Sequence, residues 1–170
     1  MTNEYKVIIR THGCPCGYLG DPKRTCKCSP LQVQKYRGRI SGPLVDRIDI
    51  HVEVPAVAYR KLRSTDPGTS SADIRQQVIS ARRRQKQRFG SDSTLTNTRM
   101  TSRAIRKHCP LDEACESLLK QAMHELGLSA RAHDKLLKLS RTIADLAEAD
   151  SIKPEHLSEA IQYRLLDRTV

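Results

Sequence analysis

Aromatic side chains are scarce in this sequence. Its 170 residues include no tryptophan, one phenylalanine (Phe89) and five tyrosines. A hydrophobic core must therefore be built from Leu, Ile, Val and Ala, which favours helices packed on helices. The scarcity also argues against a protein that binds single-stranded nucleic acid by stacking its bases on aromatic rings.

Long apolar runs are missing as well. No segment approaches the roughly 20 apolar residues that a membrane-spanning helix needs, and the first residues do not resemble a signal peptide. We therefore expect a cytoplasmic protein without a membrane partner. At 170 residues, the chain has room for one ordinary domain or two small ones.

The sequence also lacks the phosphate-binding loop of P-loop ATPases. That loop has the pattern G-x-x-x-x-G-K-[ST], and none of the eight glycines belongs to such a pattern. No strand that ends in Asp-Glu, the Walker B pattern, offers a magnesium ligand. Because P-loop enzymes hold ATP through these parts, we expect that the chain alone does not hydrolyse ATP.

Acidic residues are outnumbered by basic ones. Lys and Arg total 30 against 19 Asp and Glu, which gives a formal net charge of +11. Such an excess favours anionic partners, either nucleic acid or nucleotide phosphates. The densest cluster supplies our DNA-contact candidates, which are Arg82, Arg83, Arg84, Lys86 and Arg88. The alternative for this cluster is a solvated basic helix end.

Four cysteines form two C-x-C pairs in the stretch HGCPCGYLGDPKRTCKCSP, and they are Cys14, Cys16, Cys26 and Cys28. In a cytosolic chain, such close pairs indicate metal or redox chemistry rather than structural disulfides. Four thiolates suit a tetrahedral zinc ion, although C-x-x-C is the commoner spacing. Free loop thiols are the alternative. We expect Cys109 and Cys115 to be small buried side chains on helices.

Apolar spacing predicts a mainly α protein. Short strands are expected over 4–10 and 47–55, and "STDPGTSS" at 64–71 is the best linker candidate. Helices are expected over 29–38, 70–90, 101–109, 111–127, 129–150 and 153–167. The predicted layout is a small α/β part over 1–66 followed by a helical bundle over 71–170.

Two arginines lie where predicted elements begin. Arg47 enters the second strand, where spacing alone suggests an ordinary surface residue. Arg131 follows the helix cap Ser129 by two residues, where a cation opposes the helix dipole. That placement makes sense if a phosphate binds there, because arginine grips phosphate with a bidentate fork.

Two blocks, 14–55 and 127–164, resemble the C-terminal part of the ComM/YifB proteins, which are Mg-chelatase-subunit-I-like AAA+ ATPases. The resemblance implies the end of an AAA+ α/β core with a Cys-rich insertion, followed by a helical lid. It also implies a hexameric ring of identical or full-length subunits that uses ATP and Mg²⁺, once a P-loop part is present, for DNA branch migration and natural transformation.

The resemblance also implies roles for single residues. Arg47 resembles the arginine finger that reaches a neighbour's nucleotide in trans, and Arg131 resembles the sensor arginine at the γ-phosphate. His12 occupies the place of the family's sensor asparagine, where this sequence departs from the family's Asn-Pro pair. Two other functions stay open: a zinc-containing basic nucleic-acid-binding module and a magnesium chelatase ATPase subunit. The cysteine loop argues against the second of these.

Overall fold

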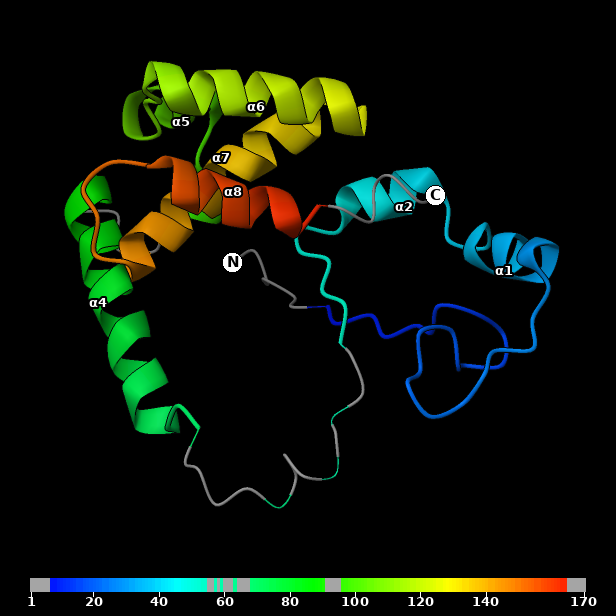
Figure 1. The fold of residues 1–170 in the computed structure, drawn as a ribbon. Helices are drawn as coiled ribbons and strands as arrows, with labels where there is room; N and C mark the ends of the chain where they lie inside the picture. Colours follow the sequence, from blue (N-terminus) through cyan, green and yellow to red (C-terminus); the bar gives the residue numbers. More distant parts are fainter. Residues whose placement is uncertain are drawn as a thin grey trace. The chain divides into compact units, whose positions relative to one another are not determined.

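The computed structural model describes residues 7–54, 57, 59, 63, 68–90 and 96–164. These residues form helices and no strand, so the predicted mainly α class is confirmed (Figure 1). The chain divides into two compact units. The first holds Met1–Ser41 and Glu53–Ser64 with Val170, and the second holds Gly42–Val52 and Thr65–Thr169. No helix in the described ranges has the length and apolar character needed to cross a bilayer.

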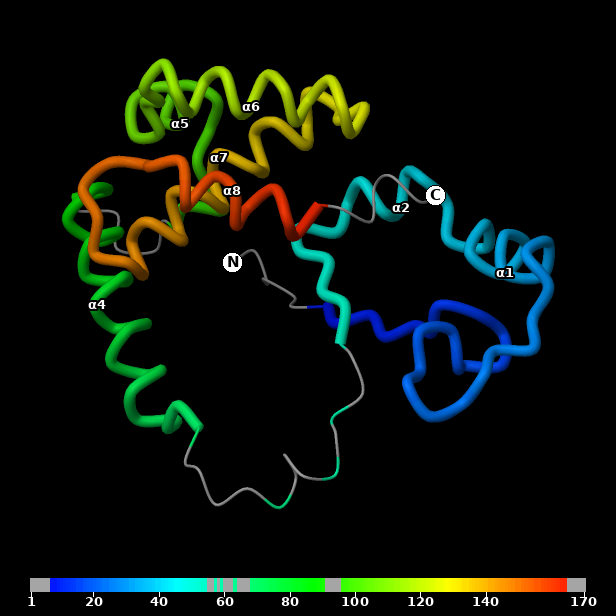
Figure 2. Tube along the Cα trace, viewed as in Figure 1, coloured from blue at the N-terminus to red at the C-terminus, as the bar shows by residue number. Residues whose placement is uncertain are grey.

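The larger described part of the first unit is the cysteine loop with helix α1 (Pro30–Arg37). The loop before α1 follows an irregular path, as the blue part of the tube shows (Figure 2). A reciprocal capping box starts the helix, because Ser29 Oγ accepts from the Gln32 N–H and Gln32 Oε1 accepts from the Ser29 N–H. Pro30 in the first turn and Gly38 at the end complete the helix that the sequence predicts.

The second unit is a helical bundle built around α7. Its elements are α2 (Gly42–Arg47), α4 (Ser71–Phe89), the 3₁₀ turn η1 (Asn97–Arg99), α5 (Ser102–His108), α6 (Glu113–Leu126), α7 (Ala130–Leu146) and α8 (Pro154–Gln162). Helix α7 packs against α4, α5, α8 and η1, and α6 packs against α8. The core is Leu, Ile, Ala, Met and Cys, with Leu136 and Leu157 fully buried. This core has the aliphatic composition that the lack of aromatic residues predicts.

Polar caps and one glycine set the ends of these helices. Ser129 Oγ accepts from the Ala132 N–H at the start of α7, as predicted. Helix α6 ends at Gly127, whose φ of 60° lies in the left-handed region. Pro154 lies in the first turn of α8, which ends at Gln162, earlier than the sequence predicts.

Both predicted strands are wrong within the described residues. Residues 7–10 and 48–54 form no ladder, and helix α2 occupies 42–47. A strand needs a neighbour for its backbone groups, and here the His51 N–H donates instead to the Tyr163 carbonyl at 2.9 Å. The alternating apolar residues remain exposed, with Val52 at 60% and Val54 at 83%. Residues 4–6 and Pro55 lie outside the described residues.

Candidate functional site

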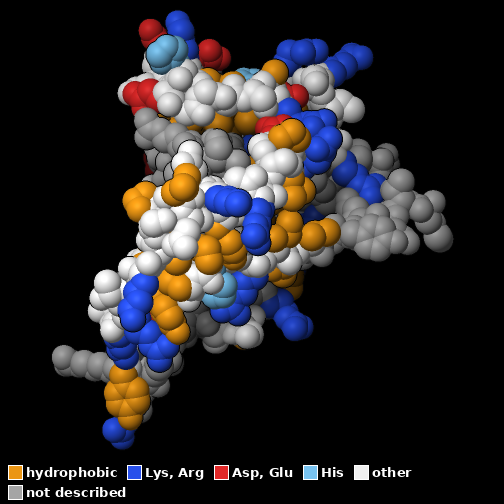
Figure 3. Space-filling model, turned by 90° about the vertical axis from the view of Figure 1, so that its right-hand side faces the viewer, with side chains coloured by type: hydrophobic (Ala, Val, Ile, Leu, Met, Phe, Trp, Pro, Cys, Tyr) orange, Lys and Arg blue, Asp and Glu red, His pale blue; other side chains and the backbone are white. Residues whose placement is uncertain are grey.

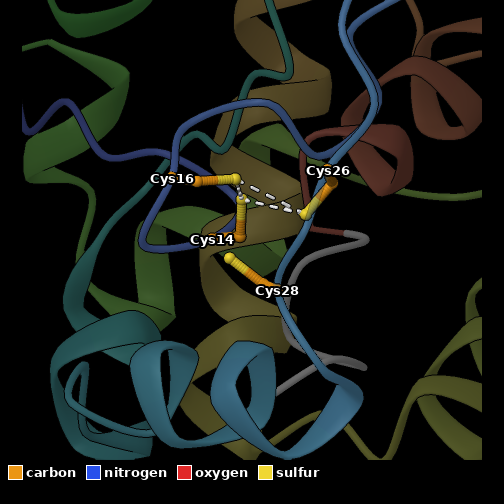
Figure 4. A group of neighbouring side chains, drawn as sticks. All are labelled: Cys14, Cys16, Cys26 and Cys28. Carbon is orange, nitrogen blue, oxygen red and sulfur yellow. Dashed lines mark hydrogen bonds between the residues drawn. The ribbon is translucent and has the colours of Figure 1, made fainter.

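The four cysteines of the loop converge on one point. Their Sγ atoms all lie within 4.8 Å of one another, and no disulfide joins them. Cys14 Sγ lies 3.4 Å from Cys16 Sγ and 3.6 Å from Cys26 Sγ, and Cys16 Sγ lies 3.6 Å from Cys26 Sγ. Figure 4 shows the four side chains pointing toward a common centre from the two arms of the loop.

Local backbone contacts give the loop its path. The Gly17 N–H donates to the Cys14 carbonyl, and Gly17 has a φ of 80°, which a side chain there would strain. Asp21 Oδ1 accepts from the backbone N–H groups of Lys23 and Arg24 and closes a second turn between the arms. Arg37 Nε donates to the Gly13 carbonyl at 3.3 Å, which ties α1 to the first arm.

The thiols do not titrate alike. A hydrogen bond from the Tyr18 backbone, with help from Cys14, lowers the pKa of Cys16 to about 6. The Cys28 backbone acts in the same direction on Cys26, but burial and the neighbouring thiols outweigh it and raise the pKa of Cys26 to about 12. The pKa of Cys28 is also raised, by the Cys16 thiol and by burial, against a lowering contact from the Cys16 backbone. The cluster therefore favours one thiolate and disfavours further ones unless a cation joins them.

This donor set fits a tetrahedral metal ion. Zinc–sulfur bonds of about 2.3 Å place tetrahedral sulfurs about 3.8 Å apart. The three sulfur separations among Cys14, Cys16 and Cys26, at 3.4, 3.6 and 3.6 Å, lie close to that value. The cation would offset the mutual repulsion of four thiolates, which is the cost that the raised pKa values record.

His12, the residue predicted to act as a sensor, also lies in the first unit. Its side chain is exposed and lies beside the cysteine loop, since a Cβ at Gly17 would stand 3.7 Å from His12 Nδ1. The expected strand end at this residue is absent, so His12 lies in an irregular segment. Its assignment as a sensor remains a prediction.

The second unit brings the segments of Arg47 and Arg131 together. Arg47 is the last residue of α2, is exposed, and donates through Nη1 to the Pro43 carbonyl at 3.1 Å. Arg131 lies in the first turn of α7, where its side chain is 60% exposed. Asp46 joins the two elements, because its Oδ2 lies 3.9 Å from Arg131 Nη1 and its Oδ1 accepts from Ser129 Oγ at 3.0 Å.

Two further cations fix this junction, and sequence reasoning missed both. Lys135 Nζ donates to the carbonyls of Asp46 and Arg47 at 2.9 and 2.8 Å. Arg164 follows α8, is buried, lies 3.7 Å from Asp46 Oδ1 and donates to the Ile48 carbonyl. Their partners lie about ninety residues or more away in sequence, so no local pattern marks them.

The basic cluster of α4 divides into two sets. Arg84 and Arg88 turn toward the protein: Arg84 pairs with Asp150 at 2.9 Å, and Arg88 pairs with the buried Asp145 at 2.5 Å. Arg82, Arg83 and Lys86 are exposed to solvent. Figure 3 looks from the right-hand side of Figure 1, away from α4, and on that face other Lys and Arg side chains lie among hydrophobic ones. Three of the five DNA-contact candidates are therefore exposed, although Arg82 also donates to Gln85 Oε1 at 3.3 Å, and the other two fasten α4 to the bundle.

Comparisons with known proteins place both units in one family. Residues 2–62 match the family model of "Magnesium chelatase, subunit ChlI", and residues 68–164 match that of "Magnesium chelatase, subunit ChlI C-terminal". The chain is 37% identical over 167 residues to "Competence protein ComM" of Haemophilus influenzae. It is 38% identical over 167 residues to "Uncharacterized protein YifB" of Escherichia coli and 28% identical over 161 residues to a protein of Mycobacterium tuberculosis.

These relatives are much longer than the chain. The matches cover 97% of this chain but only 31% of the Haemophilus protein. For the Escherichia protein the shares are 97% and 32%, and for the Mycobacterium protein they are 95% and 31%. The chain thus spans about a third of the length of the curated relatives that it matches.

Proposed function

The chain belongs to the magnesium chelatase subunit ChlI family and resembles its ComM/YifB members, and on that premise we propose that it supplies the arginine-bearing and lid part of a ring-shaped AAA+ ATPase that acts on DNA. In this proposal residues 1–66 are the end of the α/β core and residues 71–170 are the lid. The chain is not catalytic alone, because its sequence holds no phosphate-binding loop.

The observation that carries the proposal is the junction of α2 and α7. It holds Arg47 and Arg131 on adjoining elements, both exposed and therefore able to reach an anion. Arg47 serves as the finger in a neighbouring subunit's site, where charge builds on the transferred phosphoryl group. Arg131 meets the γ-phosphate from the lid of its own subunit. His12 is assigned to the same nucleotide as a hydrogen-bond donor. ATP and Mg²⁺ are bound only when a subunit part that carries the P-loop is present.

The cysteine cluster has a structural role in this proposal. Cys14, Cys16, Cys26 and Cys28 hold one zinc ion that closes the loop at the rim of the ring. DNA contacts the exposed cations Arg82, Arg83 and Lys86 of α4 through its phosphates. The Haemophilus relative is named a competence protein, and this name supports the proposal of DNA as the substrate.

The test is ATP turnover in a reconstituted ring. The purified chain is mixed with the P-loop-bearing part of a longer relative, and turnover is followed in a coupled assay. We expect Arg47→Ala to spare nucleotide binding and to lower turnover by on the order of 10³-fold or more, as removal of an arginine finger does. Arg131→Ala should weaken ATP binding itself.

Arg75→Ala is the control, because Arg75 is an exposed arginine on α4 outside the junction. It should leave both quantities unchanged. Near-normal turnover with Arg47→Ala would make Arg47 an ordinary surface arginine and would refute the proposed interface. Turnover by the isolated chain, abolished by Arg131→Ala, would refute the claim that it is not catalytic alone.

A second candidate function is a free-standing zinc-containing module that binds nucleic acid. The exposed cations of α4 favour it, and so does the cysteine loop, whose four thiols lie close enough together to bind one metal ion. The two functions differ in one outcome: a module of this kind binds DNA with equal affinity in the presence and absence of the P-loop partner and ATP.

A further inference from the structure

We propose that Lys135 and Asp46 are positioning residues that couple Arg131 to Arg47, so that a phosphate held by Arg131 changes the placement of Arg47; this rests on the proposed function of the two arginines. Both residues lie in the second unit, between the end of α2 and the start of α7. Neither is an arginine of the site itself, and each acts through its contacts to one.

Lys135 holds the end of α2. Its ammonium group donates to the Asp46 and Arg47 carbonyls at 2.9 and 2.8 Å and pairs with Asp49 Oδ1 at 2.9 Å. The last carbonyls of a helix lack partners within it and carry partial negative charge, so a cation there both satisfies and stabilises them. The Lys135 side chain is only 19% exposed, which limits competition from water. The backbone of Arg47 is thereby fixed to α7, one turn beyond Arg131.

Asp46 links the same two elements from the other side. Its carboxylate accepts from Ser129 Oγ at 3.0 Å and lies within ion-pair reach of Arg131 and Arg164, at 3.9 and 3.7 Å. The pair with Arg131 is the long and solvent-exposed one, since the Arg131 side chain is 60% exposed. An anion that meets Arg131 therefore competes with Asp46 for the guanidinium group.

The two contacts give a path from one arginine to the other. When Arg131 turns to a phosphate, Asp46 loses one cation and keeps Ser129 and Arg164. Asp46 is the residue before Arg47 in a helix of six residues, and Val45 is the buried residue of that helix. So short a helix has little packing of its own to resist a shift at Asp46. With the Lys135 hydrogen bonds in place, the Arg47 backbone stays attached to α7 during that shift. Without these hydrogen bonds, the Arg47 backbone is no longer held to α7.

The first test needs neither ATP nor a ring. Amide hydrogen exchange of the full chain is measured for wild type, Lys135→Met and Lys138→Met. Lys138 is the matched control, because it lies on the same helix and its Nζ donates at 2.9 Å to the Thr98 carbonyl of η1 rather than to a carbonyl of α2. The readouts are the Ile48 and His51 amides, which donate to the Val45 and Tyr163 carbonyls.

We expect about tenfold faster exchange at these amides in Lys135→Met, because hydrogen bonds from a charged donor are lost. Lys138→Met should match wild type there, and Lys135→Arg should restore slow exchange. Millimolar tripolyphosphate should alter exchange over 44–51 in wild type but not in Arg131→Ala or Lys135→Met. The inference is overturned by equal exchange in the two methionine variants, or by the absence of a tripolyphosphate effect in wild type.

The second test uses the reconstituted ring. Lys135→Met should keep the KM for ATP within about twofold and lower kcat about tenfold, since both arginines remain but the finger is misplaced. Lys138→Met should keep both values. A Lys135→Met ring that turns over ATP like the control overturns the coupling and leaves the proposed function intact. A wild-type ring without turnover overturns the proposed function, and the exchange measurements still decide the coupling.

Discussion

Asp145 is a buried carboxylate between two arginines. It accepts from Arg88 at 2.5 and 2.7 Å, from Arg141 Nε at 3.2 Å and from Asn97 at 2.8 Å. Burial alone raises the pKa of Asp145, but the hydrogen bonds of Arg88 and Asn97 and the charges of both arginines outweigh it, so the pKa lies below its usual value. This residue connects α4, η1 and α7.

We expect Asp145→Asn to destabilise the second unit by about 3–5 kcal/mol, because two guanidinium groups lose their charge partner in a buried site. Urea unfolding followed by circular dichroism measures the change. Asp150→Asn is the matched control: Asp150 also pairs with an arginine of α4, but its side chain is 97% exposed. It should change stability little. Equal effects of the two variants would contradict the role given to burial.

The contribution of the Asp145 carboxylate to stability should depend on pH. Because its pKa is lower in the folded protein than the ordinary value of 3.8, Asp145 stabilises the fold above that value. The contribution is lost as the pH falls through the folded pKa. The difference in unfolding free energy between wild type and Asp145→Asn should therefore be constant near neutral pH and shrink below about pH 4. A difference that does not shrink with acid would contradict this linkage.

Single residues differ in how far the sequence predicts them. The convergence of Cys14, Cys16, Cys26 and Cys28 was predictable, because metal-ligand spacing is a local pattern. The spacing of Arg141 and Asp145 also marks a helical i,i+4 pair. Arg88 pairs with Asp145, which lies 57 residues later. No local pattern shows this pair, so Arg88 was predicted to contact DNA together with its neighbours in the basic cluster. Tertiary partners of this kind require the folded structure.

Helix ends show the effect of one backbone conformation. Gly127 terminates α6 with a φ of 60°, and a Cβ there would meet nothing within 4 Å. Gly127→Ala should therefore destabilise the bundle by about 1 kcal/mol through backbone strain alone. Gly42→Ala is the control, since Gly42 also has open space but no positive φ. Thermal unfolding should show a lower Tm for the first variant and no loss for the second, and equal losses would contradict the account.

Elements divide by what stabilises them. The sequence predicts α1, α6 and α7 because caps, terminal glycines and apolar spacing act within one segment. The two strand predictions are wrong because an alternating pattern indicates only which face of a strand would be apolar. It does not show that a neighbouring strand is present to pair with it. Helix α2 was not predicted, because residues far away in the sequence stabilise it. Its six residues have weak local signals, and Ser129, Lys135 and Arg164 hold it from elsewhere in the chain.

The two units of the whole molecule differ in their cores. The second unit buries a cluster of aliphatic side chains, whereas Cys14 is the buried side chain among the described residues of the first. So small an apolar core calls for another source of stability, and a metal can supply it. We expect about one zinc ion per chain in protein purified under reducing conditions, measured by elemental analysis. Less than about a tenth of an equivalent would contradict the site.

Chelation tests the same division between the units. Removing zinc should speed amide exchange over 12–41 and leave the thermal unfolding of the second unit unchanged. Cys26→Ser should lose the metal. Cys109→Ala is the control, because Cys109 is a buried thiol of the second unit and should leave the zinc content intact.

The charge of the whole molecule bears on DNA binding, and the structure limits which cations take part. A net charge of +11 attracts DNA at long range, whatever the position of the cations. Close phosphate contacts add a salt dependence, with a slope of log K against log salt of about 0.9 per contact on duplex DNA. Changing Arg82, Arg83 and Lys86 together to Gln should therefore lower the magnitude of the slope by up to about 2.7.

The matched control changes the exposed Arg103, Arg106 and Lys107 of α5 to Gln, which removes the same charge from another helix. Fluorescence anisotropy with a duplex of mixed sequence, over a salt series, gives both slopes. A larger loss for the α4 variant indicates contact, whereas equal losses mean that net charge alone attracts DNA and that α4 is a solvated basic helix.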